Sequence, residues 1–316
     1  MTFNEGGQFE GGRVRKGGRG AVGAGVGGGA ALVIALLYMV LTGNSPADIL
    51  GGTAPDGGGG GEQGYIGDCT AEQANTDPEC RLNAAVQSLD AYWATTLPDQ
   101  GGIEYELPEV VSFTQAVSTG CGNATSATGP FYCPADTTVY EDLAFYDQLS
   151  SQFGAEGGPL AEMYVTAHEF GHHIENQLGL FERADRSGTG PESDSVRIEL
   201  MADCLAGMWA GNAATTEDPD TGVTFLEPIS REQLEQALSA AAAVGDDNIQ
   251  RRSGGDVNPE AFSHGSSEQR VKWFSIGYEG APSRTATRWT PPPSDVTVNG
   301  MHLSARTTTP DPSGAR

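Results

Sequence analysis

The stretch AHEFGHHIENQLG (167–179) contains two histidines and a glutamate at a spacing that can bind a metal. On an α-helix, His168 and His172 lie one turn apart on the same face, and Glu169 lies about a quarter turn away. Since the chain has only 5 histidines, this H-E-x-x-H pattern rarely arises by chance. It predicts a zinc site in which the glutamate acts as general base. The alternative is an amphipathic helix with two solvated histidines.

A catalytic zinc site commonly has a third protein ligand. A histidine six residues after H-E-x-x-H would supply it in some zinc peptidases, but Leu178 stands there. The downstream stretch SVRIELMADCLAGMWAGN (195–212) places Glu199 and Asp203 one helical turn apart. Glu199 is therefore the expected third ligand, and Asp203 is expected to orient a ligand histidine through its second ring nitrogen. A solvated acidic helix face is the alternative.

Helices are expected to position these residues. Pro159 and Gly179 supply start and stop signals for the helix that carries H-E-x-x-H. In the second helix, Ala202 and Ala206 flank the carboxylates, and such small side chains let another helix come close. The apolar residues of the first helix recur at helical spacing, roughly opposite the histidines: Met163, Ala167, Phe170, Ile174 and Leu178.

H-E-x-x-H followed on a later helix by E-x-x-x-D resembles the gluzincin arrangement of metallopeptidases. Further stretches resemble the bacterial neutral zinc metallopeptidase family over roughly residues 69–280: CGNATSATGPFYCPADTTVYEDLAFYDQL, YVTAHEFGHHIENQLG, SVRIELMADCLAGMWAG and FSHGSSEQRVKWF. The resemblance implies a membrane-tethered zinc peptidase with a gluzincin-like catalytic domain. One zinc per chain, bound by His168, His172 and Glu199, is expected.

The last predicted helix begins at a capping box formed by Ser266 and Gln269, which places His264 in the preceding loop. A loop histidine is by itself more often solvated. A histidine followed six residues later by an arginine resembles the late motif of other gluzincin peptidases. This resemblance implies that His264 stabilises the oxyanion and that Arg270 orients a carboxylate.

The order of the predicted elements, strands followed by helices, indicates an α+β domain with a small antiparallel sheet beside a helical bundle. In gluzincins the substrate pairs with a sheet edge, so Thr138, Val139 and Tyr140 are expected in a substrate-binding edge strand. An interior strand is the alternative. Strands are predicted at 109–117 and 137–143, and helices at 80–97, 142–153, 231–244 and 266–278 in addition to the two above.

Residues 21–42 contain no charged residue and are long enough to span a bilayer as one helix. The positive-inside rule predicts that residues 1–20 are cytoplasmic and that the remainder lies outside the cell membrane. A cleaved signal peptide is the alternative. The basic residues that precede the span are Arg13, Arg15, Lys16 and Arg19.

Composition divides the rest of the chain. Residues 43–64 are expected to be a glycine-rich linker, 65–280 one metallopeptidase domain and 281–316 a disordered tail.

The net charge of −25 argues against a nucleic-acid partner. Four cysteines are spaced so that they could close two loops in an oxidising compartment, although their pairing does not follow from spacing: Cys69, Cys80, Cys121 and Cys133.

These features predict a membrane-anchored, extracytoplasmic zinc peptidase, an endopeptidase rather than an exopeptidase, acting on a peptide or protein. Zinc would lower the pKa of a water molecule, and Glu169 would take its proton. Two alternatives are a non-catalytic zinc-containing surface binding protein and a zinc hydrolase of a non-peptide envelope amide. The intact Glu169 argues against the first, because a binding protein needs no general base.

Overall fold

The computed structural model describes residues 2–17 and 64–280. The predicted membrane span and tail lie outside these residues, as does the predicted linker except for Gly64. No helix in the two described ranges is long and apolar enough to cross a membrane.

The helical bundle that the sequence predicts is present. Helix α6 packs against α4, α8 and α9, and α11 packs against α8 and α9. The long helices are α4 (Pro78–Thr96), α6 (Pro159–Gln177), α8 (Asp194–Asn212), α9 (Arg231–Ala243) and α11 (Ser267–Gly280). The short ones are α3 (Ala71–Thr76), α5 (Phe145–Ser151), α7 (Leu180–Arg183), α10 (Asp246–Arg252), a π-helical turn (Leu97–Gly101) and a 3₁₀ turn (Pro259–Ala261).

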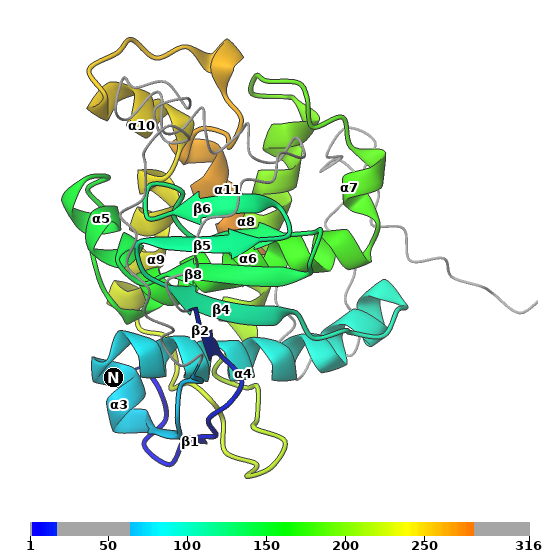
Figure 1. The fold of residues 1–316 in the computed structure, drawn as a ribbon, viewed down its shortest axis with the longest axis vertical. Helices are drawn as coiled ribbons and strands as arrows, with labels where there is room; N and C mark the ends of the chain where they lie inside the picture. Colours follow the sequence, from blue (N-terminus) through cyan, green and yellow to red (C-terminus); the bar gives the residue numbers. More distant parts are fainter. Residues whose placement is uncertain (1, 18–63, 281–316) are drawn as a thin grey trace, which may run out of the picture.

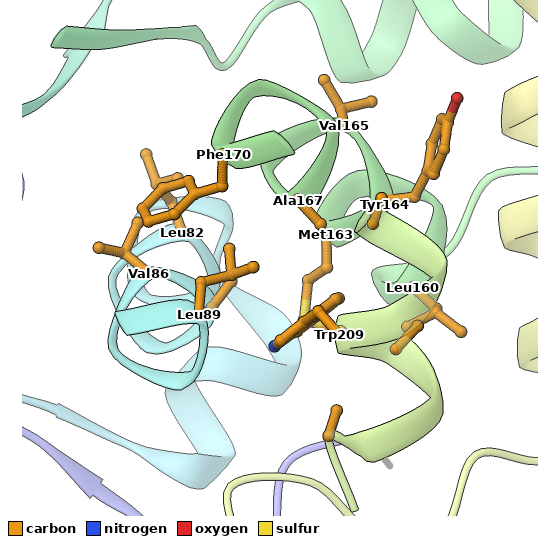
Figure 2. Packing of buried hydrophobic residues seen from close by; sticks show 14 of the residues in the cluster. Leu82, Val86, Leu89, Leu160, Met163, Tyr164, Val165, Ala167, Phe170 and Trp209 are labelled. Carbon is orange, nitrogen blue, oxygen red and sulfur yellow. The ribbon is translucent and has the colours of Figure 1, made fainter. Parts of the chain in front are cut away.

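The main core lies between α4, α6 and α8. Figure 2 shows Leu89 of α4 on the side that faces Met163 of α6 and Trp209 of α8. The Trp209 indole N–H donates a hydrogen bond of 3.1 Å to Ser88 on α4, which satisfies its polar atom inside the core. The helix that carries both histidines is therefore fixed along its apolar side.

The largest sheet has four strands in the order β2-β4-β8-β7. The first three run parallel and β7 runs antiparallel to β8, so the predicted antiparallel sheet is in fact mixed. Parallel neighbours need long connections, because the chain must cross back to the other end of the sheet before the next strand can run in the same direction. The strands of this sheet are β2 (Arg15–Lys16), β4 (Glu109–Phe113), β7 (Phe131–Cys133) and β8 (Thr138–Asp142), and the remaining ones are β1 (Gln8–Phe9), β3 (Cys69–Thr70), β5 (Ala116–Thr119) and β6 (Gly122–Thr125).

The prediction of a substrate-binding edge strand at Thr138, Val139 and Tyr140 is wrong. These residues belong to β8, which is buried and pairs with β4 on one side and β7 on the other. Their backbone groups are already used by both neighbours, so β8 has no free edge. The edge strand at this side of the sheet is β7.

The N-terminal residues 2–17 belong to the same folded domain. Phe3 and Phe9 are buried in the main core, and the Asn75 side chain accepts hydrogen bonds from the backbone N–H groups at positions 2 and 3. Strand β1 pairs with β3 and β2 pairs with β4, so this segment supplies an edge strand of the main sheet (Figure 1, dark blue). The domain therefore includes more than the predicted range 65–280.

Polar contacts hold the segment in place at its end. Arg13 forms an ion pair with Asp90 on α4, with an N–O distance of 2.6 Å. The backbone N–H of Lys16 donates to the carbonyl of Gly64 at 2.8 Å. The chain thus leaves the described fold after Gly17 and re-enters it beside the same point.

This packing has a consequence for topology. Two segments in direct contact must lie on the same side of a membrane. The predicted arrangement, with residues 1–20 in the cytoplasm and the domain outside, would separate residues 2–17 from the strands and side chains that they contact. The sequence could not show this, because the pairing joins positions far apart in the chain. The location of the domain itself stays a prediction.

The cysteines pair as their spacing allows. Cys69 is bonded to Cys80 and Cys121 to Cys133, with Cα–Cα distances of 5.7 and 5.8 Å. The first bond ties β3 to α4, and the second ties the β5–β6 hairpin to β7. Cys204 is free, and burial raises the pKa of its thiol to about 12, so it is an unreactive packing residue.

We expect Phe3→Ala to lower the free energy of unfolding by about 3–5 kcal/mol, because it removes a fully buried ring. Chemical denaturation of the purified protein measures the effect. Leu107→Ala is the control, since Leu107 is 63% exposed and its loss should change stability by less than about 0.5 kcal/mol. Equal stability of Phe3→Ala and wild type would show that residues 2–17 do not pack on the domain.

Candidate metal centre

Two histidines of α6 and one glutamate of α8 meet at one point. His168 Nε2 lies 3.2 Å from Glu199 Oε2, and His172 Nε2 lies 3.6 Å from Glu199 Oε1. The donor atoms of the three residues all lie within 4.8 Å of one another. Each side chain is partly exposed, by 8 to 17%, so the site is mostly buried but reachable from outside.

The donor set fits zinc. Zinc–ligand bonds of about 2.0–2.1 Å in tetrahedral geometry require neighbouring donor atoms roughly 3.3 Å apart, close to the two distances above. Two imidazoles and one carboxylate leave a fourth position for water, which is the arrangement of a catalytic rather than a structural zinc. The structure therefore brings together the three ligands expected from the sequence.

The close contact of α6 and α8 places the glutamate beside the histidines. A Cβ atom at Gly171 would lie 2.9 Å from the Cα atom of Ala202, so a larger residue at either position would push the helices apart. Helix α6 begins at Pro159, and α8 is capped by Ser193, whose side chain accepts from the backbone at residue 196.

Asp203 holds His168 from behind. Its Oδ1 atom lies 3.0 Å from His168 Nδ1 and accepts a 2.6 Å hydrogen bond from the Tyr164 hydroxyl. Arg270 donates to both carboxylate oxygens of Asp203, at 3.0 Å each. Burial favours a raised pKa of Asp203, but the charges of Arg270 and His168 outweigh it and lower that pKa. The ionised Asp203 keeps the proton of His168 on Nδ1 and leaves Nε2 free for metal.

Glu175 has the same relation to His172. Its Oε2 atom lies 2.8 Å from His172 Nδ1, and the side chain is fully buried. Burial raises the pKa of Glu175 to about 7, although the hydrogen bond and charge of His172 act to lower it. No role was expected for Glu175, but its position three residues after His172 on a helix could have indicated this contact.

Glu169 is 7% exposed and is not among the three residues that could bind zinc. Behind it lies Glu141 of β8, which is fully buried. Burial, and next the charge of Glu169, raise the pKa of Glu141 to about 8. Glu141 is therefore mainly neutral at pH 7 and adds little negative charge next to Glu169.

His264 lies in the loop before α11, where the predicted capping box of Ser266 and Gln269 is present. Asp246, the first residue of α10, fixes this loop, because its Oδ2 atom accepts the backbone N–H groups of residues 263, 264 and 265 at 2.7 to 3.0 Å. Its Oδ1 atom lies 3.3 Å from His264 Nδ1. Eighteen residues separate the two partners, so no local sequence signal identified Asp246.

The charges of His264 and Glu199 influence each other. Desolvation acts to lower the pKa of His264, but the negative charge of Glu199 and the hydrogen bond from Asp246 outweigh it and raise that pKa. Burial of Glu199 acts to raise its pKa, but His172 and His264 hold it well below its ordinary value. A cationic imidazole is therefore favoured beside the metal ligands.

Comparison with known proteins gives one family. Residues 4–287 match the model of the family described as "Putative neutral zinc metallopeptidase". A 210-residue region is 49% identical to "Uncharacterized protein Rv2575" of Mycobacterium tuberculosis, covering 66% of this chain and 70% of that protein. A 192-residue region is 42% identical to "Uncharacterized protein YpfJ" of Escherichia coli K12, covering 59% and 63%. No solved structure gives a significant match.

We expect the purified protein to bind one zinc ion per chain, and His168→Ala and Glu199→Ala to lose it, because each removes one of three donors. Metal analysis after dialysis against a weak chelator measures the content. Glu182→Gln, an exposed carboxylate on α7, should keep the wild-type content. Full zinc in both ligand variants would exclude this site.

Proposed function

The chain belongs to this neutral zinc metallopeptidase family, and from that premise we propose that it hydrolyses internal peptide bonds at the site formed by α6, α8 and the loop before α11. The observation that carries the proposal is the placement of Glu169 between the two histidines that face Glu199. A three-donor zinc site with an adjacent carboxylate outside the ligand set is suited to activating water.

Each residue has a distinct part in the proposed reaction. Bound zinc supplies Lewis acidity, which makes a water molecule acidic enough to lose a proton near neutral pH. Glu169 accepts that proton while the water attacks the peptide carbonyl, and returns it to the departing amine. Because Glu141 behind it is mainly neutral, Glu141 adds little electrostatic repulsion to the carboxylate of Glu169.

His264 is proposed to stabilise the negative oxygen that develops on the carbonyl carbon. Its Nδ1 atom lies 3.3 Å from the Asp246 carboxylate, which favours a protonated ring, and a positive donor is most effective where negative charge develops. The hydrogen bonds that Asp246 accepts from the loop backbone keep His264 in place before substrate arrives. Arg270 acts farther away, through Asp203.

Strand β7 replaces β8 as the proposed substrate edge. It lies along α6, since Tyr132 of β7 contacts His173, the residue next to His172. An extended peptide that paired with this edge and reached the zinc in mid-chain would be cleaved internally rather than at a terminal residue. The disulfide from Cys133 to Cys121 holds the strand.

We also propose that the domain works outside the cytoplasm. Its two disulfide bonds favour an oxidising compartment. Attachment to the membrane stays a prediction, and residues 2–17 and the domain, which are in contact, would then lie on one side of it.

We expect Glu169→Gln to reduce peptide hydrolysis by at least about 100-fold, because it removes the general base. Zinc content should stay at the wild-type value, since Glu169 is not a ligand. Turnover of a diverse peptide library, metal analysis and thermal melting are measured together. An equally active variant with bound zinc would contradict the mechanism. A zinc-loaded wild type that cleaves no peptide would favour a binding protein or a hydrolase of another amide.

We expect Glu5→Cys and Asp256→Cys to react alike with a membrane-impermeant maleimide added to intact spheroplasts. Both positions are exposed, and the partly buried Cys204, whose thiol pKa is raised by burial, leaves a low background. Labelling of both supports an exterior domain with residues 2–17 on the same side. Labelling of neither before lysis contradicts the exterior location, and labelling of Asp256→Cys alone contradicts the packing.

A further inference from the structure

Glu175 is a buried carboxylate that the proposed reaction does not use. It lies one turn after His172 on α6, has no exposed surface, and places one oxygen 2.8 Å from the Nδ1 atom of His172. Its other oxygen, Oε1, is buried without a hydrogen-bond partner. Among the described residues, the imidazole of His172 is thus the one group that forms a hydrogen bond with Glu175.

Such a group is costly to bury for structural reasons alone. A buried charge normally needs a partner of opposite charge and several hydrogen bonds. Asp203, equally buried, has them: two hydrogen bonds from Arg270 and one from Tyr164, besides the contact with His168. Glu175 has no comparable support, and replacement of a poorly paired buried charge is often neutral or stabilising for a fold.

The charges around the site show what could compensate it. Asp203 is balanced by Arg270, which leaves Glu199 and Glu175 as the two further carboxylates in contact with the ligand histidines. A divalent cation at the three donors has two positive charges and would match these two negative ones. A divalent cation bound by His172 would therefore compensate the charge of Glu175 through the same imidazole.

We infer that Glu175 is the positioning residue of His172. This role rests on the proposed zinc site: Glu175 orients His172 in the same way that Asp203 orients His168. Its carboxylate accepts the Nδ1 proton, which fixes the tautomer with a free lone pair on Nε2 and makes that nitrogen a stronger ligand. The two histidines are thus oriented independently, one from α8 and one from within α6.

The test is the zinc affinity of the full-length protein, measured by competition with a fluorescent chelator. Glu175→Ala should bind zinc about 10- to 100-fold more weakly than wild type, the usual effect of losing such a partner. Glu175→Gln keeps the shape and an acceptor oxygen but not the charge, so a smaller loss is expected. Glu182→Gln, a carboxylate-to-amide change on exposed α7, should stay within about twofold of wild type.

Melting of the metal-free proteins separates positioning from a structural role. We expect the metal-free Glu175 variants to stay folded at the assay temperature, with a cooperative melting transition, while their zinc affinity falls. The inference is overturned by wild-type affinity in both variants, or by loss of affinity that only follows loss of folding. It falls together with the proposed function if the wild type itself binds no zinc, whereas unchanged zinc in the variants leaves that function intact.

Discussion

The close approach of α6 and α8 at Gly171 and Ala202 is the contact on which the site depends. On α6 the two histidines lie on either side of this contact, and on α8 Glu199 and Asp203 do the same. A Cβ atom at residue 171 would meet the backbone of Ala202, so any larger side chain would widen the gap between the helices. Glu199 and Asp203 would then lie farther from the histidines, which weakens both the third ligand and the partner of His168.

The ligand residues could be predicted because the information is local. His168 and His172 share a face through helical spacing alone, and the same holds for Glu199 and Asp203. Arg270 was assigned by resemblance, and the structure places it on a carboxylate. Positions that depend on tertiary contacts were missed, such as Asp246, whose hydrogen bonds reach a loop eighteen residues away.

The fold could be predicted where elements have their own periodicity, and less well where pairing decides. The long helices agree with the apolar patterns of the sequence to within a few residues. The stretch TTVYEDL predicts a strand but contains no information about its neighbours, so edge and interior positions remained open and the edge was chosen wrongly. The same limit applies to residues 2–17, whose strands have two residues each and exist only through partners near residues 69 and 111.

The distribution of buried charge links the metal to the stability of the domain. Glu199 and Glu175 lie next to imidazoles whose protonation is favoured in the absence of metal, as the raised pKa of His172 indicates: desolvation opposes it, and Glu199 and Glu175 outweigh that effect. Metal binding must therefore displace protons from these rings. The charge of the divalent cation then takes the place of those protons beside the carboxylates of Glu199 and Glu175. The ligands come from two helices that the main core already joins, so apolar packing sets much of the geometry of the site. Bound metal would stabilise the placement of the ligands, which follows from the contact of Gly171 with Ala202 and from the buried carboxylates beside the histidines.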